Sequence, residues 1–224
     1  MADLREIFYS LEKISDKWDP YFDVYEKHFH RYIGKAPKIL EIGVQNGGSI
    51  DMWVKYFGEG TQVVGIDVLP QCLELNYPEN VEIVIGDQAS NDFWDGFLAN
   101  HTDFDIVIDD GGHTMIQQIV TLNRVFPHVK DGGVFLCEDT HTSYWKDWGG
   151  GWNSPKTFLH YATELTDYVN MNHIPKGYIS KKSIEIFKDK LNSISFYNSM
   201  VVFEKQYNKN FERVFSDRRQ LNNQ

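Results

Sequence analysis

The sequence has few cysteines, no long apolar run and no excess of basic residues. Only two cysteines, Cys72 and Cys137, occur among 224 residues, and they lack the spacing of a metal-binding pair. Without a disulfide framework, a reducing cytoplasmic location is expected. No stretch approaches the roughly 20 apolar residues of a membrane span, and the N-terminus lacks the apolar centre of a signal peptide. We therefore expect no membrane partner.

The charge balance is acidic, with a formal net charge of −10. Nucleic-acid binding depends on a basic surface that contacts phosphates, so no nucleic-acid partner is expected. A small or neutral substrate stays compatible with this charge. The length and the 42% hydrophobic content are typical of one globular domain with added segments.

Apolar runs recur along the chain and predict five buried strands. The runs are KILEIGV, QVVGIDV, VEIVIGD, FDIVIDD and GVFLCED. Apolar residues at helical spacing follow the first and the fourth run, and strands that alternate with helices indicate a doubly wound parallel sheet. SISFYN and SMVVFEK predict a C-terminal antiparallel hairpin. The expected fold is α/β and Rossmann-like, with seven mostly parallel strands.

Two segments lie outside this alternation. Residues 1–35 predict a helical N-terminal extension, and residues 140–190 predict an insert on the substrate side, with a helix over about 156–169. Both belong to a single expected domain, 1–224. The insert contains Trp145, Trp148 and Trp152 near a run of glycines. These rings could stack on a sugar as a lid, or they could anchor the insert in a core, and the sequence favours neither reading.

A glycine-containing loop follows the first apolar run and predicts a nucleotide-type site. Its glycines allow a sharp turn and a close approach to a ligand at the start of the next helix, which Ser49 could cap. The spacing differs from the G-x-G-x-x-G loop of dinucleotide-binding dehydrogenases. Glu41 would repel a pyrophosphate but attract a cationic sulfonium or ammonium group.

Polar residues at the ends of the next strands extend this candidate site. Asp67 is placed to accept hydrogen bonds from ribose hydroxyls, and Asp87 with Gln88 to reach an adenine edge. The candidate cofactor-binding residues are Glu41, Gly43, Gly47, Ser49, Asp67, Asp87, Gln88 and Asp109.

Acidic residues crowd the ends of two neighbouring apolar runs. Such charges are costly unless they are paired, bind a metal or take part in chemistry. Asp110, Glu138 and Asp139 are hard oxygen ligands suited to Mg²⁺, and His113 beside them is a candidate base. Asp109 is expected to support the site or to face the cofactor. The alternatives are that Asp109 and Asp110 cap a helix and that Glu138 and Asp139 end a strand in solvent.

These motifs resemble known families. EIG…G, IDV, GD and IDD with the closing strand pair are similar to class I S-adenosylmethionine-dependent methyltransferases. SDKWDPYFDVYEKHF, EIGVQNGGS, IDDGGH and EDTHTSYW together resemble the metal-dependent sugar O-methyltransferases of macrolide tailoring, with DDGGH where that family more often has DDGSH. The resemblance implies S-adenosylmethionine and Mg²⁺ as cofactors and His113 as general base. It also places Asp16, Lys17 and Trp18 near the cofactor, where a turn and a core aromatic are the other interpretation.

The resulting hypothesis is methyl transfer to a sugar hydroxyl of a small-molecule saccharide or glycosylated product, in antibiotic or polysaccharide biosynthesis. His141, Tyr144 and Trp145 are candidate substrate contacts, with His141 also a rival base. A homo-oligomer is expected from the resemblance. Two alternatives stay open: metal-independent methylation of a small molecule, and binding of S-adenosylmethionine without turnover.

Overall fold

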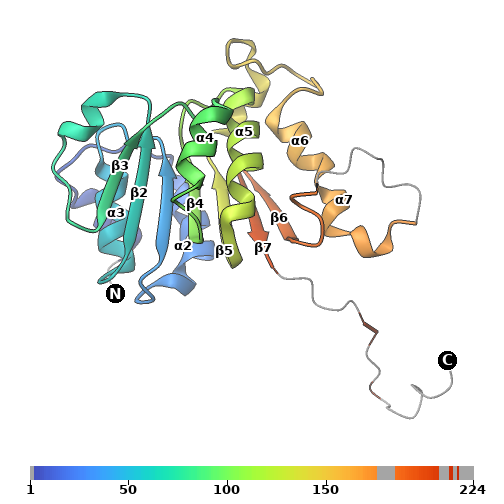
Figure 1. Ribbon diagram of the computed structural model, residues 1–224, viewed down its shortest axis with the longest axis horizontal. Helices are drawn as coiled ribbons and strands as arrows, with labels where there is room; N and C mark the ends of the chain where they lie inside the picture. The colour runs from blue at the N-terminus through green and yellow to red at the C-terminus, as the bar shows by residue number, and fades with distance from the viewer. Residues whose placement is uncertain (1–2, 176–184, 207–211, 214–215, 217–224) are drawn as a thin grey trace.

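A computed structural model describes residues 3–175, 185–206, 212–213 and 216 (Figure 1). These residues form a seven-stranded sheet in the order β3-β2-β1-β4-β5-β7-β6, as the apolar runs predict. Strands β1 to β5 are parallel, and β7 is antiparallel to both β5 and β6. The strands are β1 (Lys38–Ile42), β2 (Gln62–Asp67), β3 (Val81–Ile85), β4 (Phe104–Asp109), β5 (Val129–Cys137), β6 (Leu191–Tyr197) and β7 (Met200–Lys205).

Helices cover both faces of the sheet. In Figure 1, α4 (Asn91–Leu98), α5 (Met115–Val125) and α6 (Phe158–Glu164) lie in front of it, while α2 (Asp19–Phe29) and α3 (Gly48–Phe57) lie behind. The remaining α-helices are α1 (Leu4–Tyr9) and α7 (Thr166–Val169). Short 3₁₀ turns are η1 (His30–Tyr32), η2 (Pro70–Glu74), η3 (Phe126–His128), η4 (Thr140–Tyr144), η5 (Lys146–Trp148) and η6 (Met171–His173).

The strands are apolar on both faces because each face packs against a helical layer. Leu40 and Ile42 of β1 join the core beneath α4 and α5, whereas Ile39 of the same strand joins the core beneath α2 and α3. Trp94 and Trp53 are fully buried in these two cores, one in each. This packing fixes the positions of the strand ends, where the candidate site residues begin. No helix in the described ranges is both long enough and apolar enough to cross a membrane.

Several local expectations differ from the structure. Gly47, in a left-handed conformation, is the N-cap of α3, so Ser49 lies inside the helix and does not cap it. Thr114 caps α5 through a reciprocal pair of hydrogen bonds with Gln117, which leaves Asp109 and Asp110 without a capping role. The expected helix over 156–169 is divided at Leu165 into α6 and α7. Residues 176–184 of the expected insert lie outside the described residues.

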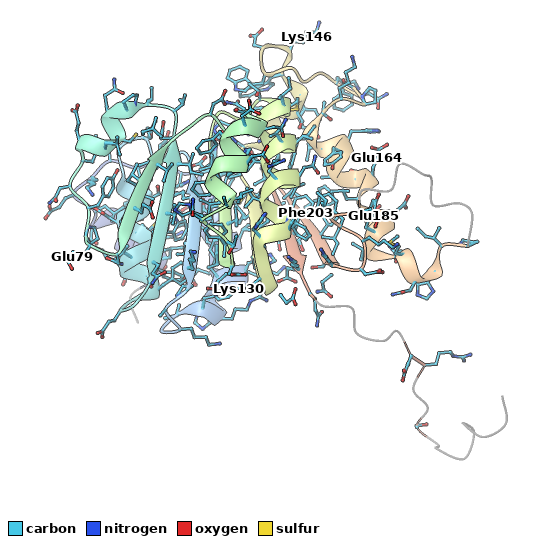
Figure 2. The ribbon with its side chains drawn as sticks, in the orientation of Figure 1. Glu79, Lys130, Lys146, Glu164, Glu185 and Phe203 are labelled. Atoms are coloured by element: carbon cyan, nitrogen blue, oxygen red, sulfur yellow. The ribbon has the colours of Figure 1, made fainter. Side chains whose placement is uncertain are left out.

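The strand order changes direction between β1 and β4, which lie next to each other in the middle of the sheet. In open α/β sheets the crevice beyond the carboxyl ends of strands at such a point is where ligands bind. Figure 2 shows Lys130, at the start of β5, far below Lys146, which follows the end of that strand. The carboxyl ends of the parallel strands therefore face the upper edge of the view.

Candidate active site

A cleft of about 510 Å³ lies beyond the carboxyl ends of the parallel strands. Its wall combines the glycine loop with the ends of β2, β3 and β4 and with residues from the N-terminal segment. Predicted site residues that line it are Gly43, Ser49, Asp67, Asp87, Gln88, Asp110, His113 and Asp139. The sheet thus brings most of the predicted cofactor residues and the predicted base into one cavity.

Gly43 is required by the geometry of the loop. Its φ is +96°, a region that side chains disfavour, and a Cβ atom there would lie 2.0 Å from the carbonyl oxygen of Asp110. The backbone after β1 therefore passes directly against the backbone after β4. This contact places the glycine loop beside the acidic residues.

Replacing Gly43 with alanine is expected to destabilise the protein and to displace Asp110. The unfavourable φ alone should cost about 1–3 kcal/mol, and the overlap with the Asp110 carbonyl adds to that. Gly34→Ala is the matched control, because Gly34 has a φ of +69° but a Cβ atom there would have no neighbouring atom within 4 Å. Urea unfolding should show the larger loss for Gly43→Ala; equal losses would contradict a tight contact at this point.

Asp67 and Gln88 hold the cofactor side of the cleft in shape. One Asp67 oxygen accepts hydrogen bonds from the backbone N–H groups of Val44 and Gln45, both at 2.9 Å. Gln88 accepts a bond from the Gly112 N–H at 2.8 Å and donates to Asp109 at 2.9 Å. The end of β2 therefore fixes the glycine loop, and Gln88, three residues after β3, fixes the loop that carries His113.

Three predicted cofactor residues do not line the cleft: Gly47, which is the N-cap of α3, and Glu41 and Asp109, which lie behind the cleft wall. Glu41 and Asp109 are buried and do not line the cavity. Burial raises the pKa of each to about 7. The side chains of Ser49 and Trp53 lie beside the Glu41 carboxyl group, whereas Asp109 is held by Gln88. Asp109 thus supports the cleft from below, and Glu41 places a buried carboxyl group behind it.

Asp110, His113 and Asp139 form the acidic cluster on the floor of the cleft. The Nε2 atom of His113 lies 3.9 Å from Oδ1 of Asp110 and 3.6 Å from Oδ2 of Asp139. One ligand atom from each of the three residues lies within 4.8 Å of the other two, an arrangement that could hold a metal ion. His113 and Asp139 both have a left-handed backbone, with φ of +57° and +52°. Such strain persists where the surrounding structure demands it, and it is concentrated at functional sites.

Glu138 faces away from these three atoms. It is buried, and one of its oxygens accepts a hydrogen bond from Tyr25 Oη at 2.7 Å while the other pairs with Lys17 Nζ at 2.9 Å. Burial, followed by repulsion from Asp110, raises the pKa of Glu138 to about 8. Its burial excludes the interpretation of Glu138 as a strand end in solvent.

Lys17 is the buried cation of the site. Its Nζ atom pairs with Oδ2 of Asp110 as well as with Glu138, and its side chain is only 2% exposed. Burial lowers the pKa of Lys17, but attraction to Asp110 and Glu138 outweighs this effect, so the net pKa is raised. Tyr21 donates a hydrogen bond to Oδ1 of Asp139 at 2.5 Å. The inward oxygens of the acidic residues are thus paired, and the outward oxygens of Asp110 and Asp139 face His113.

Aromatic side chains border the acidic cluster on the side of the insert. His141 Nδ1 hydrogen-bonds Ser199 Oγ and lies 3.8 Å from Oδ1 of Asp139. The His141 ring packs edge-on against Trp145 and lies near Trp18. Trp18 and Trp145 are 62% and 48% exposed.

Tyr144 and Trp152 form a separate pair of rings, 5.9 Å apart and exposed to 52% and 86%. These exposures argue against a core role for Trp18, Trp145 and Trp152.

The sequence alone indicates no definite role for Lys17, Tyr21 or Tyr25. All three belong to the motif SDKWDPYFDVYEKHF, and all three bond to the acidic residues after β4 and β5. The spacing of a lysine and two tyrosines at four-residue intervals is the available signal. This spacing could indicate that the three side chains point the same way, but it could not identify the acidic residues that they contact.

Comparisons with known proteins find similarity to O-methyltransferases. No family model matches the chain. The chain is 30% identical over 178 residues to the mycinamicin VI 2''-O-methyltransferase of Micromonospora griseorubida, covering 71% of this chain and 43% of that protein. It is 31% identical over 162 residues to the demethylmacrocin O-methyltransferase of Streptomyces fradiae, covering 68% and 40%.

The solved structure of a methyltransferase from the mycinamycin pathway, in complex with Mg, SAH and mycinamycin VI, superposes with a TM-score of 0.80. It is 26% identical and covers 93% of this chain and 55% of that one. The chain spans less than half the length of the two curated relatives.

The fold, with its glycine loop and carboxylate-lined cleft, is that of the class I S-adenosylmethionine-dependent methyltransferases, and the chain belongs to that fold class. Within this class it is similar to the sugar O-methyltransferases that modify macrolide antibiotics.

Proposed function

We propose that the protein transfers a methyl group from S-adenosylmethionine to a sugar hydroxyl with the help of Mg²⁺. The observation that carries this proposal is the convergence of Asp110, His113 and Asp139 on the floor of the cleft. The named sugar O-methyltransferases to which the chain is similar support the reaction class. The sugar is proposed to be part of a small molecule such as a glycosylated product.

The cleft fits the proposed methyl donor. Gly43 and Ser49 border it on one side, and Asp67 and Asp87 on another, so a nucleoside has both a close backbone and carboxylates for its hydroxyls. The carboxyl group of Glu41 is buried behind the cleft wall, and a cationic sulfonium or ammonium group in the cleft would favour its charged form.

The acidic cluster fits a hard divalent cation. The proposed ligands are Asp110 and Asp139 of this cluster together with the neighbouring Glu138. Carboxylate oxygens are the ligands that Mg²⁺ prefers. Asp110 and Asp139 each turn an oxygen toward the open cleft, whereas both oxygens of Glu138 are paired with Tyr25 and Lys17. A direct bond from Glu138 would therefore require Lys17 to shift. When bound, a divalent cation would stabilise negative charge on the acceptor oxygen.

The residues of this chain perform the proton transfer. Nε2 of His113 accepts the proton of the acceptor hydroxyl, and the nearby carboxylates of Asp110 and Asp139 stabilise the resulting imidazolium. The acceptor oxygen then forms a bond to the methyl carbon while the carbon–sulfur bond breaks. The electron pair of the carbon–sulfur bond stays on sulfur. Catalysis consists mainly of placing the hydroxyl in line with the methyl group.

The acceptor is proposed to lie on the side of the insert. His141 and Trp145 border the acidic cluster there, and an exposed aromatic ring can stack on the apolar face of a sugar. Tyr144 lies next to them in the chain and is also exposed. We further propose one domain over 1–224, a homo-oligomeric state, a cytoplasmic location and no nucleic-acid partner.

The proposal is tested by methyl transfer from S-adenosylmethionine labelled in its methyl group. The acceptor panel holds glycosylated macrolides, the same aglycones without sugar, and simple phenols. Label on a sugar oxygen is the expected result. Label on phenols alone would support a metal-independent small-molecule methyltransferase, and calorimetric binding of the cofactor without any transfer would support a binding protein.

A further inference from the structure

The insert contains a second cavity, of about 250 Å³. We call it the insert pocket, and its walls are drawn from residues 143–144 and 151–163. Ser143 and Tyr144 come from η4, and the other wall comes from the loop before α6 and from α6 itself. Among the described residues, none lines both this pocket and the cofactor cleft. The proposed chemistry therefore leaves the insert pocket unused.

The loop that carries Trp152 is fixed against η4. The Gly151 N–H donates a hydrogen bond to the carbonyl oxygen of Ser143 at 2.8 Å. A Cβ atom on Gly150 would lie 2.5 Å from the carbonyl oxygens of both Ser143 and Thr142, so the two backbones come this close only because this residue is a glycine. An anchored backbone thus presents Trp152 to solvent.

Tyr144 and Trp152 form an aromatic platform on the wall of the insert pocket. The planes of the two neighbouring rings are inclined by 32°, and both residues are exposed, Trp152 to 86%. Exposed apolar surface of this kind is unfavourable in water and is a common mark of a binding site. A pyranose ring has an apolar face of C–H groups that can pack on such a platform.

The rest of the lining is polar but carries no full charge. Among the described residues that line the pocket, none is Lys, Arg, Asp or Glu, and Leu159 is the one aliphatic side chain. A phosphate or carboxylate ligand would need a cation here, and an apolar aglycone would leave the polar groups without partners. Hydroxyl, amide and imidazole groups come from Ser143, Asn153, Ser154, Thr157, His160 and Thr163. This combination of a platform and neutral polar groups fits a neutral saccharide.

A single turn separates the insert pocket from the acidic cluster. The turn η4 begins directly after Asp139, and Thr142 in its middle donates a hydrogen bond to the carbonyl oxygen of His113 at 2.8 Å. Because a 3₁₀ turn rises about 2 Å per residue, the backbone from Asp139 to Tyr144 spans roughly 10 Å. Trp145 packs on His141 beside the cluster, whereas Tyr144 packs on Trp152 in the pocket. Two adjacent aromatic residues thus serve two neighbouring sites.

We propose that the insert pocket binds a second, neutral sugar unit that is attached to the acceptor sugar. The inference rests on the proposed function, which places the acceptor sugar at the acidic cluster. The second sugar stacks on Tyr144 and Trp152, and its hydroxyls bond to the exposed side chains of Asn153 and His160. The substrate class is therefore an oligosaccharide, or a glycoside with at least two linked sugars.

A glycan array measures this preference without any methyl transfer. The array holds neutral mono-, di- and trisaccharides of hexoses and 6-deoxyhexoses, and the protein is applied with S-adenosylhomocysteine and Mg²⁺. The best-bound di- and trisaccharides should bind about tenfold more tightly than the matching monosaccharides, because the second ring covers exposed aromatic surface. Equal binding of short and long glycans, or binding to none of them, would overturn the proposal.

Variants of Trp152 locate the preference. Trp152→Ala should reduce the ratio of the two affinities to about one, whereas Trp152→Phe keeps an aromatic ring and should keep most of the preference. Because Trp152 is so exposed, neither change should shift the midpoint of urea unfolding. Tyr9→Ala is the matched control, since Tyr9 is a 77% exposed aromatic residue on α1, which adds no residue to the pocket. A Trp152→Ala protein that keeps the tenfold ratio would overturn the proposal.

Two further comparisons separate this proposal from its neighbours. A macrolide aglycone without sugar should bind equally well to the wild-type protein and to Trp152→Ala; weaker binding to the variant would assign the pocket to the aglycone and overturn the proposal. A protein that binds disaccharides through Trp152 but methylates no sugar would overturn the proposed function alone. A protein that methylates sugars but shows no preference for linked sugars would overturn only the assignment of the insert pocket.

Discussion

Replacement of His113 by alanine is expected to lower kcat by about 10²–10⁴, the usual contribution of a positioned general base. The loss follows from the geometry of the acidic cluster. Nε2 of His113 is turned toward Asp110 and Asp139 at the floor of the cleft, where it can accept the hydroxyl proton. Steady-state methyl transfer to a glycosylated acceptor measures the effect.

Two controls separate a base from a metal ligand and from a neighbouring histidine. The His113→Ala protein should keep its affinity for Mn²⁺ and for S-adenosylhomocysteine; a large loss of Mn²⁺ affinity would make His113 a ligand. His141→Ala is the matched variant, because His141 lies similarly close to Asp139 but bonds to Ser199. It should raise the KM of the acceptor more than it lowers kcat. The opposite pattern would transfer the role of base to His141.

Removal of the metal, or of one of its proposed ligands, is the second change with a large expected effect. Dialysis against EDTA should lower kcat/KM by about 10³, and so should the substitution Asp139→Asn. The reason is that a bound cation lowers the energy of the negative charge in the transition state by several kcal/mol. Activity lost to EDTA should return with added Mg²⁺ in the wild-type protein but not in Asp139→Asn.

Asp131→Asn is the control for the loss of an acidic residue. Asp131 is exposed at the amino-terminal half of β5, the strand whose other end carries Glu138 and Asp139. It should retain wild-type kcat/KM. Full activity of the wild-type protein in EDTA, or of Asp139→Asn at any Mg²⁺ concentration, would mean that the acidic cluster does not act through a metal.

Much of the fold could be predicted from the sequence because the apolar runs coincide with buried strands. KILEIGV, FDIVIDD and GVFLCED fall in β1, β4 and β5, and the acidic residues at the ends of β4 and β5 meet at one edge of the sheet, as parallel strands require. The strands end one or two residues earlier than these runs, since Gly43 and Asp110 already form the cleft. Apolar pattern alone does not distinguish the last strand residue from the first loop residue.

The parts that the sequence did not predict depend on contacts between distant residues. Lys17 bonds to Asp110, which is 93 positions away, and nothing in a local pattern identifies that partner. Glu138 has the residue type of a metal ligand, but its burial against Tyr25 and Lys17 is a property of the packed structure. Ser49 was a reasonable cap by residue type, and the left-handed backbone of Gly47 takes that position instead.

The assignment of the acidic cluster as a metal site beside the methyl donor is central to the proposed chemistry. The most direct measurement is anomalous diffraction from crystals grown with S-adenosylhomocysteine and Mn²⁺. We expect one strong anomalous peak at coordination distance from Asp110 and Asp139, and from Glu138 if Lys17 shifts, with the sulfur of S-adenosylhomocysteine in the neighbouring cleft and His113 at the open side. A filled cleft with no anomalous peak among these carboxylates would contradict the assignment.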